Sequence, residues 1–205
     1  MEFFIEGLIF GLLLSVSLGP IFIALTQTSI EKGILPGLAV GSGIWISDFL
    51  FIFIFYNFIK TIKRTVESET FIFWMGISGA VVLLLFGIVL LVRKPELNYD
   101  HLKLSMKNYF GFWLKGFLVN TVNPFTFIFW MGVISTYIIG RDIDGTQSLI
   151  LLGTILTVII LSDTGKVYLA HFLKKWLTHN HIKWVANISG VILILFGCFL
   201  AYQVI

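Results

Sequence analysis

Residues 3–28 read FFIEGLIFGLLLSVSLGPIFIALTQT, an almost unbroken apolar run that is long enough to cross a membrane. A helix needs about 20 apolar residues to span the hydrocarbon core of a bilayer. Five further stretches of the chain meet this requirement, and short polar connections separate them. The sequence therefore predicts an all-α integral membrane protein with six transmembrane helices. The predicted spans are Phe3–Thr28, Ile34–Ile59, Phe71–Val92, Phe110–Ile139, Ser148–Leu173 and Trp184–Ile205.

The composition agrees with this class and argues against others. Hydrophobic residues make up 58% of the 205 residues and charged residues 12%, whereas soluble domains contain about 25% charged residues. The mean hydropathy is +0.97. We therefore expect a single transmembrane domain over residues 1–205, with the lipid bilayer as its solvent and no separate catalytic domain. The net charge of +3 comes from short connections between apolar stretches and does not indicate nucleic-acid binding.

Lys and Arg are unevenly distributed among the connections. The first, third and fifth connections hold eight of these residues, and the second and fourth hold four. Cytoplasmic loops carry the excess of Lys and Arg in multi-pass membrane proteins. The bias predicts that both termini lie on the same, extracytoplasmic side of a bacterial plasma (inner) membrane.

The two halves of the chain, about residues 1–95 and 108–205, resemble each other. Three short motifs recur in the same order in both halves. Each half would hold three helices, and because this number is odd the second half must insert upside down relative to the first. The expected fold is therefore a 3+3 inverted-topology repeat, an arrangement that many secondary transporters use. The matched segments are Ser17-Leu18-Gly19-Pro20 and Thr121-Val122-Asn123-Pro124, Ile46-Ser47-Asp48 and Leu161-Ser162-Asp163, and Ile77-Ser78-Gly79 and Ile188-Ser189-Gly190.

Two prolines interrupt matching spans of the two halves, Pro20 after Gly19 and Pro124 after Asn123. A proline inside a helix lacks an N–H and clashes with the carbonyl four residues earlier. Each break is therefore expected to free a backbone carbonyl, which is that of Asn120 in the second case. Such backbone is tolerated at membrane depth only against protein or a wet cavity. Matched breaks predict a substrate site, and a plain structural kink is the alternative.

Two carboxyl groups, Asp48 and Asp163, lie near the centres of apolar spans that the repeat makes equivalent. A charge at mid-membrane costs about 2.5–3.5 kcal/mol on insertion scales, and residues kept there usually face a polar cavity and carry ions or protons. Lys166 follows Asp163 by three positions on the same helical face, so it would pair with Asp163 or reach across to Asp48. These residues are predicted to bind substrate or protons. A static ion pair that only holds helices together is the alternative.

Two tryptophans, Trp45 and Trp130, lie deep in the spans near the acids and the Asn-Pro break. They are candidates for lining a substrate path because an aromatic face can hold an amine, with core or lipid-facing packing as the alternative. Small-residue faces such as the one that includes Gly43 predict close helix packing and would permit a homodimer. No metal or cofactor is expected, since the histidines and the single cysteine lack metal-site spacing. The sequence shows no evident pairing of a nucleophile with a base, so we do not expect an enzyme.

Several motifs occur together in an order and spacing that are specific: Gly19-Pro20, Lys32-Gly33, Asp48, Gly116-Phe117-Leu118-Val119-Asn120 with Asn123-Pro124, Asp163, and Trp184 to Gly190. Through them the chain resembles the LysE/RhtB family of bacterial amino-acid exporters over nearly its whole length. The resemblance implies a six-helix inverted repeat and export of amino acids or related cations driven by the proton gradient. One departure is Lys166, where family members usually carry apolar or aromatic residues. An added amine disfavours a cationic substrate and favours a neutral amino acid.

The leading hypothesis is a secondary transporter that exports a small zwitterionic amino acid, or a related metabolite, in exchange for protons. The broken helices would bind the charged ends of the substrate, and Asp48 and Asp163 would bind its ammonium group or the coupling proton. One alternative is an exporter of inorganic cations such as metal ions, as in the wider superfamily, which would need clustered ligands. The other is a membrane scaffold or subunit that transports nothing.

Overall fold

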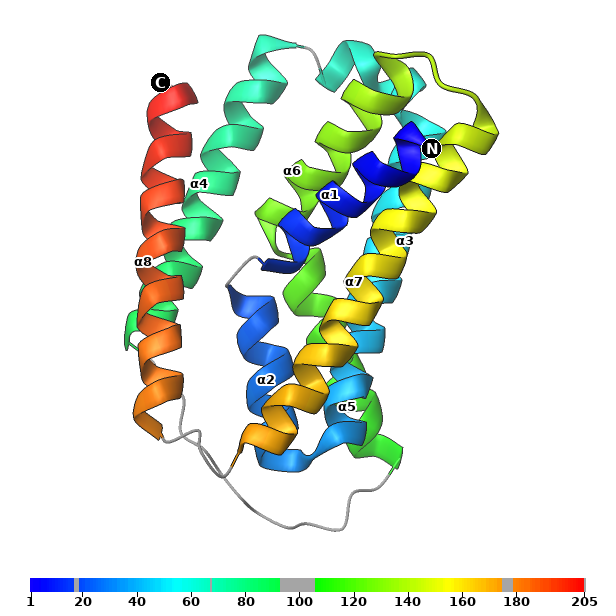
Figure 1. Ribbon diagram of the computed structural model, residues 1–205. Helices are drawn as coiled ribbons and strands as arrows, with labels where there is room; N and C mark the ends of the chain where they lie inside the picture. Colours follow the sequence, from blue (N-terminus) through cyan, green and yellow to red (C-terminus); the bar gives the residue numbers. More distant parts are fainter. Residues whose placement is uncertain (17–18, 67, 93–105, 175–178, 205) are drawn as a thin grey trace.

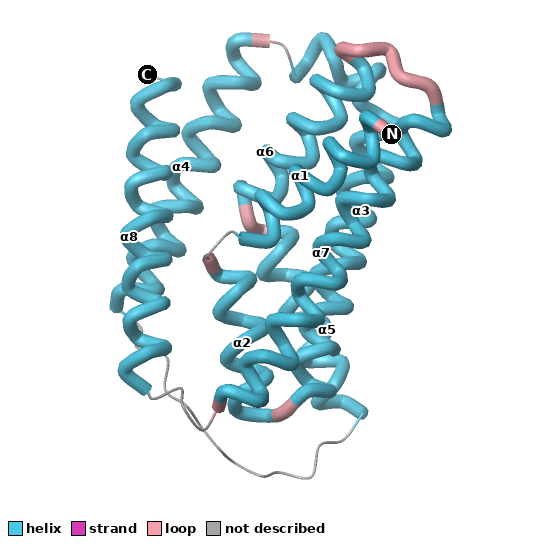
Figure 2. Tube along the Cα trace, in the orientation of Figure 1, coloured by secondary structure: helices cyan, strands magenta, loops and turns pink. Residues whose placement is uncertain are grey.

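The computed structural model describes residues 1–16, 19–66, 68–92, 106–174 and 179–204, and these residues are almost entirely helical (Figure 1; Figure 2). This confirms the predicted all-α class. The connection around residues 93–105, which was predicted to divide the two halves, and the Ser17-Leu18 pair lie outside the described residues. The elements are α1 (Glu2–Val16), α2 (Pro20–Lys32), α3 (Ile34–Val66), α4 (Glu69–Val92), α5 (Met106–Thr121), α6 (Pro124–Val133), the π-helix η1 (Ile134–Ile139), α7 (Gly145–Leu173) and α8 (His179–Val204).

The lengths of the apolar helices define a multi-pass membrane protein. Three segments are long and apolar enough to cross a bilayer unaided, namely Ile34–Phe58, Gly145–Leu173 and Ala186–Gln203. Two bent pairs, α1 with α2 and α5 with α6, qualify when each pair is taken as one span, which brings the count for the described residues to between three and five. The remaining predicted span, Phe71–Val92, is represented by the shorter apolar helix Gly76–Val92.

Both proline breaks begin a new helix instead of kinking a continuous one. Pro20 and Pro124 occupy the first turns of α2 and α6, where a missing N–H removes no helical hydrogen bond. Gly19 is the extended N-cap of α2, and the Asn123 side chain caps α6 by accepting a hydrogen bond from the N–H of Phe125 at 3.1 Å. The axes of the joined helices meet at 67° for α1 and α2 and at 64° for α5 and α6.

One detail of the second break differs from the prediction. The carbonyl of Asn120 was expected to be freed by Pro124, but it accepts a hydrogen bond from the N–H of Asn123 at 3.1 Å. The reason is that the chain makes a tight turn between α5 and α6, and this turn supplies the carbonyl with a new donor. The backbone carbonyl of Asn120 is therefore already hydrogen-bonded, and its side chain is the group that can bond to other helices.

The most extensive helix–helix contacts join the first half of the chain to the second: α1 packs with α7, α3 with α5, and α4 with α8. Glycines allow this proximity. A Cβ atom at Gly43 of α3 would overlap the carbonyl oxygen of Trp113, and one at Gly116 of α5 would overlap that of Val40. The close packing predicted for the face that includes Gly43 is thus present, and it brings the backbones of α3 and α5 into direct contact.

Two apolar clusters flank the breaks. One cluster centres on α6, η1 and α7 and includes Trp130, Ile134 and Ile155, and the other centres on α2, with Leu25 packed against Val40. In Figure 1, α4 and α8 lie side by side at one edge, and the end of α8 lies at the same end of the bundle as the N-terminus. The second segments of the two broken helices contact this pair, α2 against α8 and α6 against α4.

Many large apolar side chains point outward. Leu161, Phe172 and Leu195 are 66%, 70% and 63% exposed, respectively. Soluble monomers rarely expose contiguous apolar surface on this scale. This outer surface is suited to lipid, which agrees with the membrane class.

Candidate functional site

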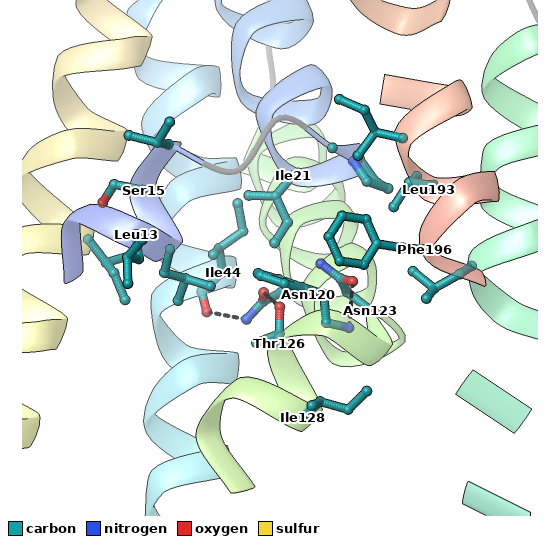
Figure 3. Close-up of a pocket in the computed structure, with 18 of the residues that line it drawn as sticks. Leu13, Ser15, Ile21, Ile44, Asn120, Asn123, Thr126, Ile128, Leu193 and Phe196 are labelled. Carbon is teal, nitrogen blue, oxygen red and sulfur yellow. Dashed lines mark hydrogen bonds between the residues drawn. The ribbon is translucent and has the colours of Figure 1, made fainter. Parts of the chain in front are cut away.

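A cavity of about 540 Å³ lies where the two broken helices meet α8 (Figure 3). Residues from all eight α-helices line it. Seven of the eight residues that the sequence predicted for substrate or proton binding are among them, namely Gly19, Pro20, Asp48, Asn120, Asn123, Asp163 and Lys166. The eighth, Pro124, begins α6, and its side chain lies outside the described part of the chain. The fold thus gathers residues that are separated by well over 100 positions.

Asp48 of α3 is held by two neutral donors. Its side chain is almost fully buried, with the residue 1% exposed. Its Oδ1 accepts hydrogen bonds from Nδ2 of Asn120 at 2.9 Å and from Nε1 of Trp130 at 2.8 Å. Neither donor carries a charge, so these contacts orient the carboxyl group without balancing the charge of its ionised form.

Asn120 is itself oriented by a buried hydroxyl. Oγ1 of Thr126 donates to Oδ1 of Asn120 at 3.0 Å, and Nδ2 of Asn120 also donates to the carbonyl of Ile44 at 3.2 Å (Figure 3). Because an amide has one acceptor and one donor end, the hydroxyl on Oδ1 leaves the NH₂ group directed at α3. The turn between α5 and α6 is thereby linked directly to Asp48.

Asp163 of α7 has a different environment. Its Oδ1 pairs with Nζ of Lys166 at 2.8 Å, and its Oδ2 accepts the indole N–H of Trp45 at 3.2 Å. Of the two predicted arrangements for Lys166, the structure therefore contains the pair with Asp163 and not the reach to Asp48. The charge of one acid is balanced by an amine, and the contacts described for the other are neutral.

The two tryptophans were candidates for lining a substrate path, but the structure places them differently. Among the described residues, the lining of the cavity does not include Trp45 or Trp130. Each donates its indole N–H to one acid, and the side chain of Trp130 is completely buried. Hydropathy and depth suggested a role near the acids, but only the helix packing determines that each indole is hydrogen-bonded to a carboxyl group.

The N-termini of α2 and α6 both lie at the cavity. Gly19 and Asn123, their N-cap residues, line it, and Figure 1 shows the two helices running from the break toward opposite ends of the bundle. A helix N-terminus carries a partial positive charge and free N–H groups. The cavity can therefore offer donors to an anionic group and carboxyl oxygens to a cationic one.

Sequence reasoning did not identify two parts of the site. Thr126 lies two positions after Pro124, where nothing in the sequence indicates that its hydroxyl would reach back to Asn120. The second part is a face of α8 that includes Leu193 and Phe196. The sequence of α8 does repeat apolar residues every three or four positions. In a span that is apolar throughout, however, such a pattern does not tell whether a helix face borders a cavity or lipid.

Within the described residues, no group of three or more His, Cys, Asp or Glu side chains lies close enough to hold a metal ion. The polar side chains among the described residues that line the cavity are instead three amides, two hydroxyls, two carboxyl groups and one amine. A multi-pass helical protein with broken helices and buried ionisable groups around a central cavity has the architecture of a membrane transporter.

The comparisons with known proteins identify the family. The LysE type translocator family matches residues 12–204, so this chain belongs to that family. In Bacillus subtilis (strain 168), the protein named "Putative amino acid efflux protein YcgF" is 27% identical over 209 residues, covering 99% of this chain and 97% of that protein. No solved structure matches the chain at a significant level. The chain is thus a multi-pass membrane protein of a family of exporters, and members of this family are transporters and not enzymes.

Proposed function

We propose that this protein exports a neutral, zwitterionic amino acid across the bacterial plasma membrane in exchange for protons. The observation that carries the proposal is the cavity at which two helix N-termini, two buried acids and one amine converge. Membership of the translocator family and the amino acid efflux named for the Bacillus relative support the substrate class.

A six-span, 3+3 inverted repeat is the topology that we propose for this single transmembrane domain. The three straight spans, the two bent pairs and α4 would make up the six crossings. Two observations support the repeat. The bends of 67° and 64° occur at corresponding Gly-Pro and Asn-Pro positions, and the α1–α7 pair has its counterpart in the α5–α3 pair. Six crossings put both termini on one side of the membrane, which the distribution of Lys and Arg favours as the outside.

The charges around the cavity match those of a zwitterion. The N-termini of α2 and α6 provide free N–H groups for a carboxylate, as helix N-termini commonly do for anions. The carboxyl groups provide acceptors for an ammonium group. Charged contacts among low-dielectric protein groups are stronger than in bulk water, so a small molecule with both charges is a better ligand than one with a single charge.

The proton and the substrate ammonium would compete for Asp48. The contacts described for this acid are neutral, so its charge is available to be balanced by either cation. Asp163, by contrast, already contacts the amine of Lys166. A site that binds either a proton or an ammonium group, but not both, couples the exit of one to the entry of the other. Lys166 would balance the charge of Asp163 and would repel a substrate with an additional positive charge.

Reconstituted vesicles provide the test. Purified protein in proteoliposomes would be loaded with a panel of radiolabelled amino acids and a pH-sensitive dye, and a pH gradient would be imposed in either direction. We expect amino acid flux that reverses with the gradient, together with substrate-dependent proton movement. Flux that ignores the gradient and moves no protons would refute the antiport, and the lack of flux for every amino acid would refute the substrate class.

A metal exporter and a non-transporting scaffold are the alternatives. The described residues contain no metal-ligand cluster, which disfavours the first. Including divalent metal ions in the same vesicle assay tests it directly. A scaffold would give no flux of any solute in the assay, and a cavity lined by buried ionisable groups has no evident use in one.

A further inference from the structure

One face of α8 forms an apolar wall of the cavity. Leu193, Phe196 and Leu200 follow one another at intervals of three and four residues, so they lie on one side of the helix, and all three line the cavity. Leu83 of α4, the helix that packs on α8, adds to this wall. We call these four residues the α8 wall. In Figure 3, Leu193 and Phe196 enter the cavity from the side of α8.

Apart from Gln203 near the end of α8, the polar residues that line the cavity come from other helices. Asp48 lies on α3, Asn120 and Thr126 belong to the second broken helix, and Asp163 and Lys166 lie on α7. In Figure 3, Asn120 and Thr126 lie toward the middle of the cavity, away from α8. The cavity is therefore amphipathic, because most of its charged and hydrogen-bonding groups come from α3, the broken helices and α7, and its apolar wall comes from α8 and α4.

The size of the cavity fits a ligand that uses both parts. Its volume of about 540 Å³ lies within the range of about 300–1,000 Å³ that is common for small-molecule sites. The ammonium and carboxylate groups of a small amino acid such as serine would reach the polar part alone. Its hydroxyl would then face apolar side chains without a hydrogen-bond partner, which is unfavourable. A large apolar side chain would instead cover the α8 wall and leave water.

We propose that the α8 wall is a side-chain subsite and that the exported substrate is a neutral amino acid with a large apolar side chain, such as leucine, methionine or phenylalanine. This inference rests on the proposed function, since it assigns the substrate of the same cavity. The Lys166–Asp163 pair argues against lysine and arginine as substrates. Asp163 is already paired with Lys166, so the second positive charge of such a substrate would have no acid left to balance it. A lipid chain could cover the wall but would leave the polar residues of the cavity without a ligand.

Competition in proteoliposomes tests the substrate class. Uptake of radiolabelled leucine under a pH gradient would be measured against unlabelled leucine, phenylalanine, serine, alanine and lysine. We expect unlabelled leucine to halve the uptake of the label at a concentration at least tenfold below the concentration of serine or alanine that does so. Lysine should not compete. Equal or better transport of serine or alanine would overturn the side-chain subsite and leave the proposed function intact. Transport of none of these amino acids would overturn both.

Substitutions on α8 locate the subsite. Leu193→Trp narrows the cavity, and Leu195→Trp makes the same change on the outer face, where Leu195 is 63% exposed. We expect Leu193→Trp to lower the preference for leucine over alanine at least tenfold, Leu195→Trp to leave it unchanged, and Leu193→Ala to shift it toward phenylalanine. If Leu193→Trp fails to insert, Leu193→Ala decides the matter. An unchanged order of preference in Leu193→Ala, or the same change in both tryptophan variants, would overturn the assignment.

Discussion

Trp130 of α6 donates its indole N–H to Oδ1 of Asp48 of α3 at 2.8 Å, across 82 positions of the sequence. The same oxygen accepts the amide of Asn120, which lies on the other side of the Asn-Pro break. Both halves of the second broken helix are thus tied to one buried carboxyl group. A change in the charge of Asp48 would alter its bonds to α5 and α6 together, and this gives a physical link between protonation and helix position.

Asp48→Asn is expected to abolish exchange while the protein still inserts into the membrane. An amide cannot take up the proton or balance an ammonium group, but it preserves size and can still accept from Asn120 and Trp130. Amino acid flux and dye response in proteoliposomes measure the effect. Asp142→Asn is the matched control, because Asp142 is exposed and its backbone has a positive φ of 50°, which asparagine tolerates. Undiminished, proton-coupled flux in Asp48→Asn would contradict the assignment.

Removing only one member of the Asp163–Lys166 pair should destabilise the protein more than removing both. Asp163→Asn leaves the amine of Lys166, which is only 17% exposed, without its counter-charge, and breaking a buried pair typically costs about 3–5 kcal/mol. The double variant Asp163→Asn/Lys166→Met removes both charges and should recover most of the loss in thermal stability in detergent.

The pair of Arg141 and Glu6, with side chains 43% and 19% exposed, is more exposed than the Asp163–Lys166 pair and provides the comparison for that experiment. Glu6→Gln is expected to change the midpoint of thermal unfolding little, since surface ion pairs contribute about 0–1 kcal/mol. The hydrogen bond from Arg141 to Glu6 raises the pKa of the guanidinium further, so Arg141 keeps its charge throughout the working pH range. A double variant of Asp163 and Lys166 that is no more stable than Asp163→Asn would speak against a buried ion pair.

Thr126→Val should slow transport by about tenfold with little effect on folding, because it removes the hydroxyl that orients Asn120 and keeps the side-chain shape. A lost hydrogen bond of this kind is worth about 0.5–1.5 kcal/mol. Thr126→Ser retains the hydroxyl and should transport like the wild type. Initial rates of exchange, normalised to the amount of folded protein, measure the difference. Equal rates in the valine and serine variants would show that the orientation of Asn120 has no role.

Gly116→Ala is expected to destabilise the protein strongly, since the added methyl group would overlap the carbonyl of Val40 in α3. Overpacking typically costs about 1–3 kcal/mol, and here the obstacle is backbone that cannot rotate away. Gly111→Ala is the matched control on the same helix, because a Cβ there meets nothing within 4 Å. Thermal unfolding followed by circular dichroism would compare the two. A midpoint for Gly116→Ala equal to that of Gly111→Ala would contradict the close contact of α3 and α5.

Much of the fold could be predicted from local features of the sequence. Long apolar runs require a membrane, and Gly19-Pro20 and Asn123-Pro124 interrupt helices wherever they occur in a span. The depth of Asp48 and Asp163 in apolar segments identified them as candidates for the site. These inferences hold because hydropathy and proline geometry act over a few neighbouring residues, irrespective of what the rest of the chain does.

The tertiary structure alone decided how these parts are used. The sequence could not indicate that Asp48 would contact Trp130 and Asn120 while Asp163 would contact Trp45 and Lys166. Three of these four contacts join residues 72 to 118 positions apart, so they depend on which helices become neighbours. The apolar face of α8 likewise became a cavity wall only when α8 packed on α4 opposite the breaks. Hydropathy assigns a residue to the membrane, but helix packing determines whether it faces lipid, protein or a ligand.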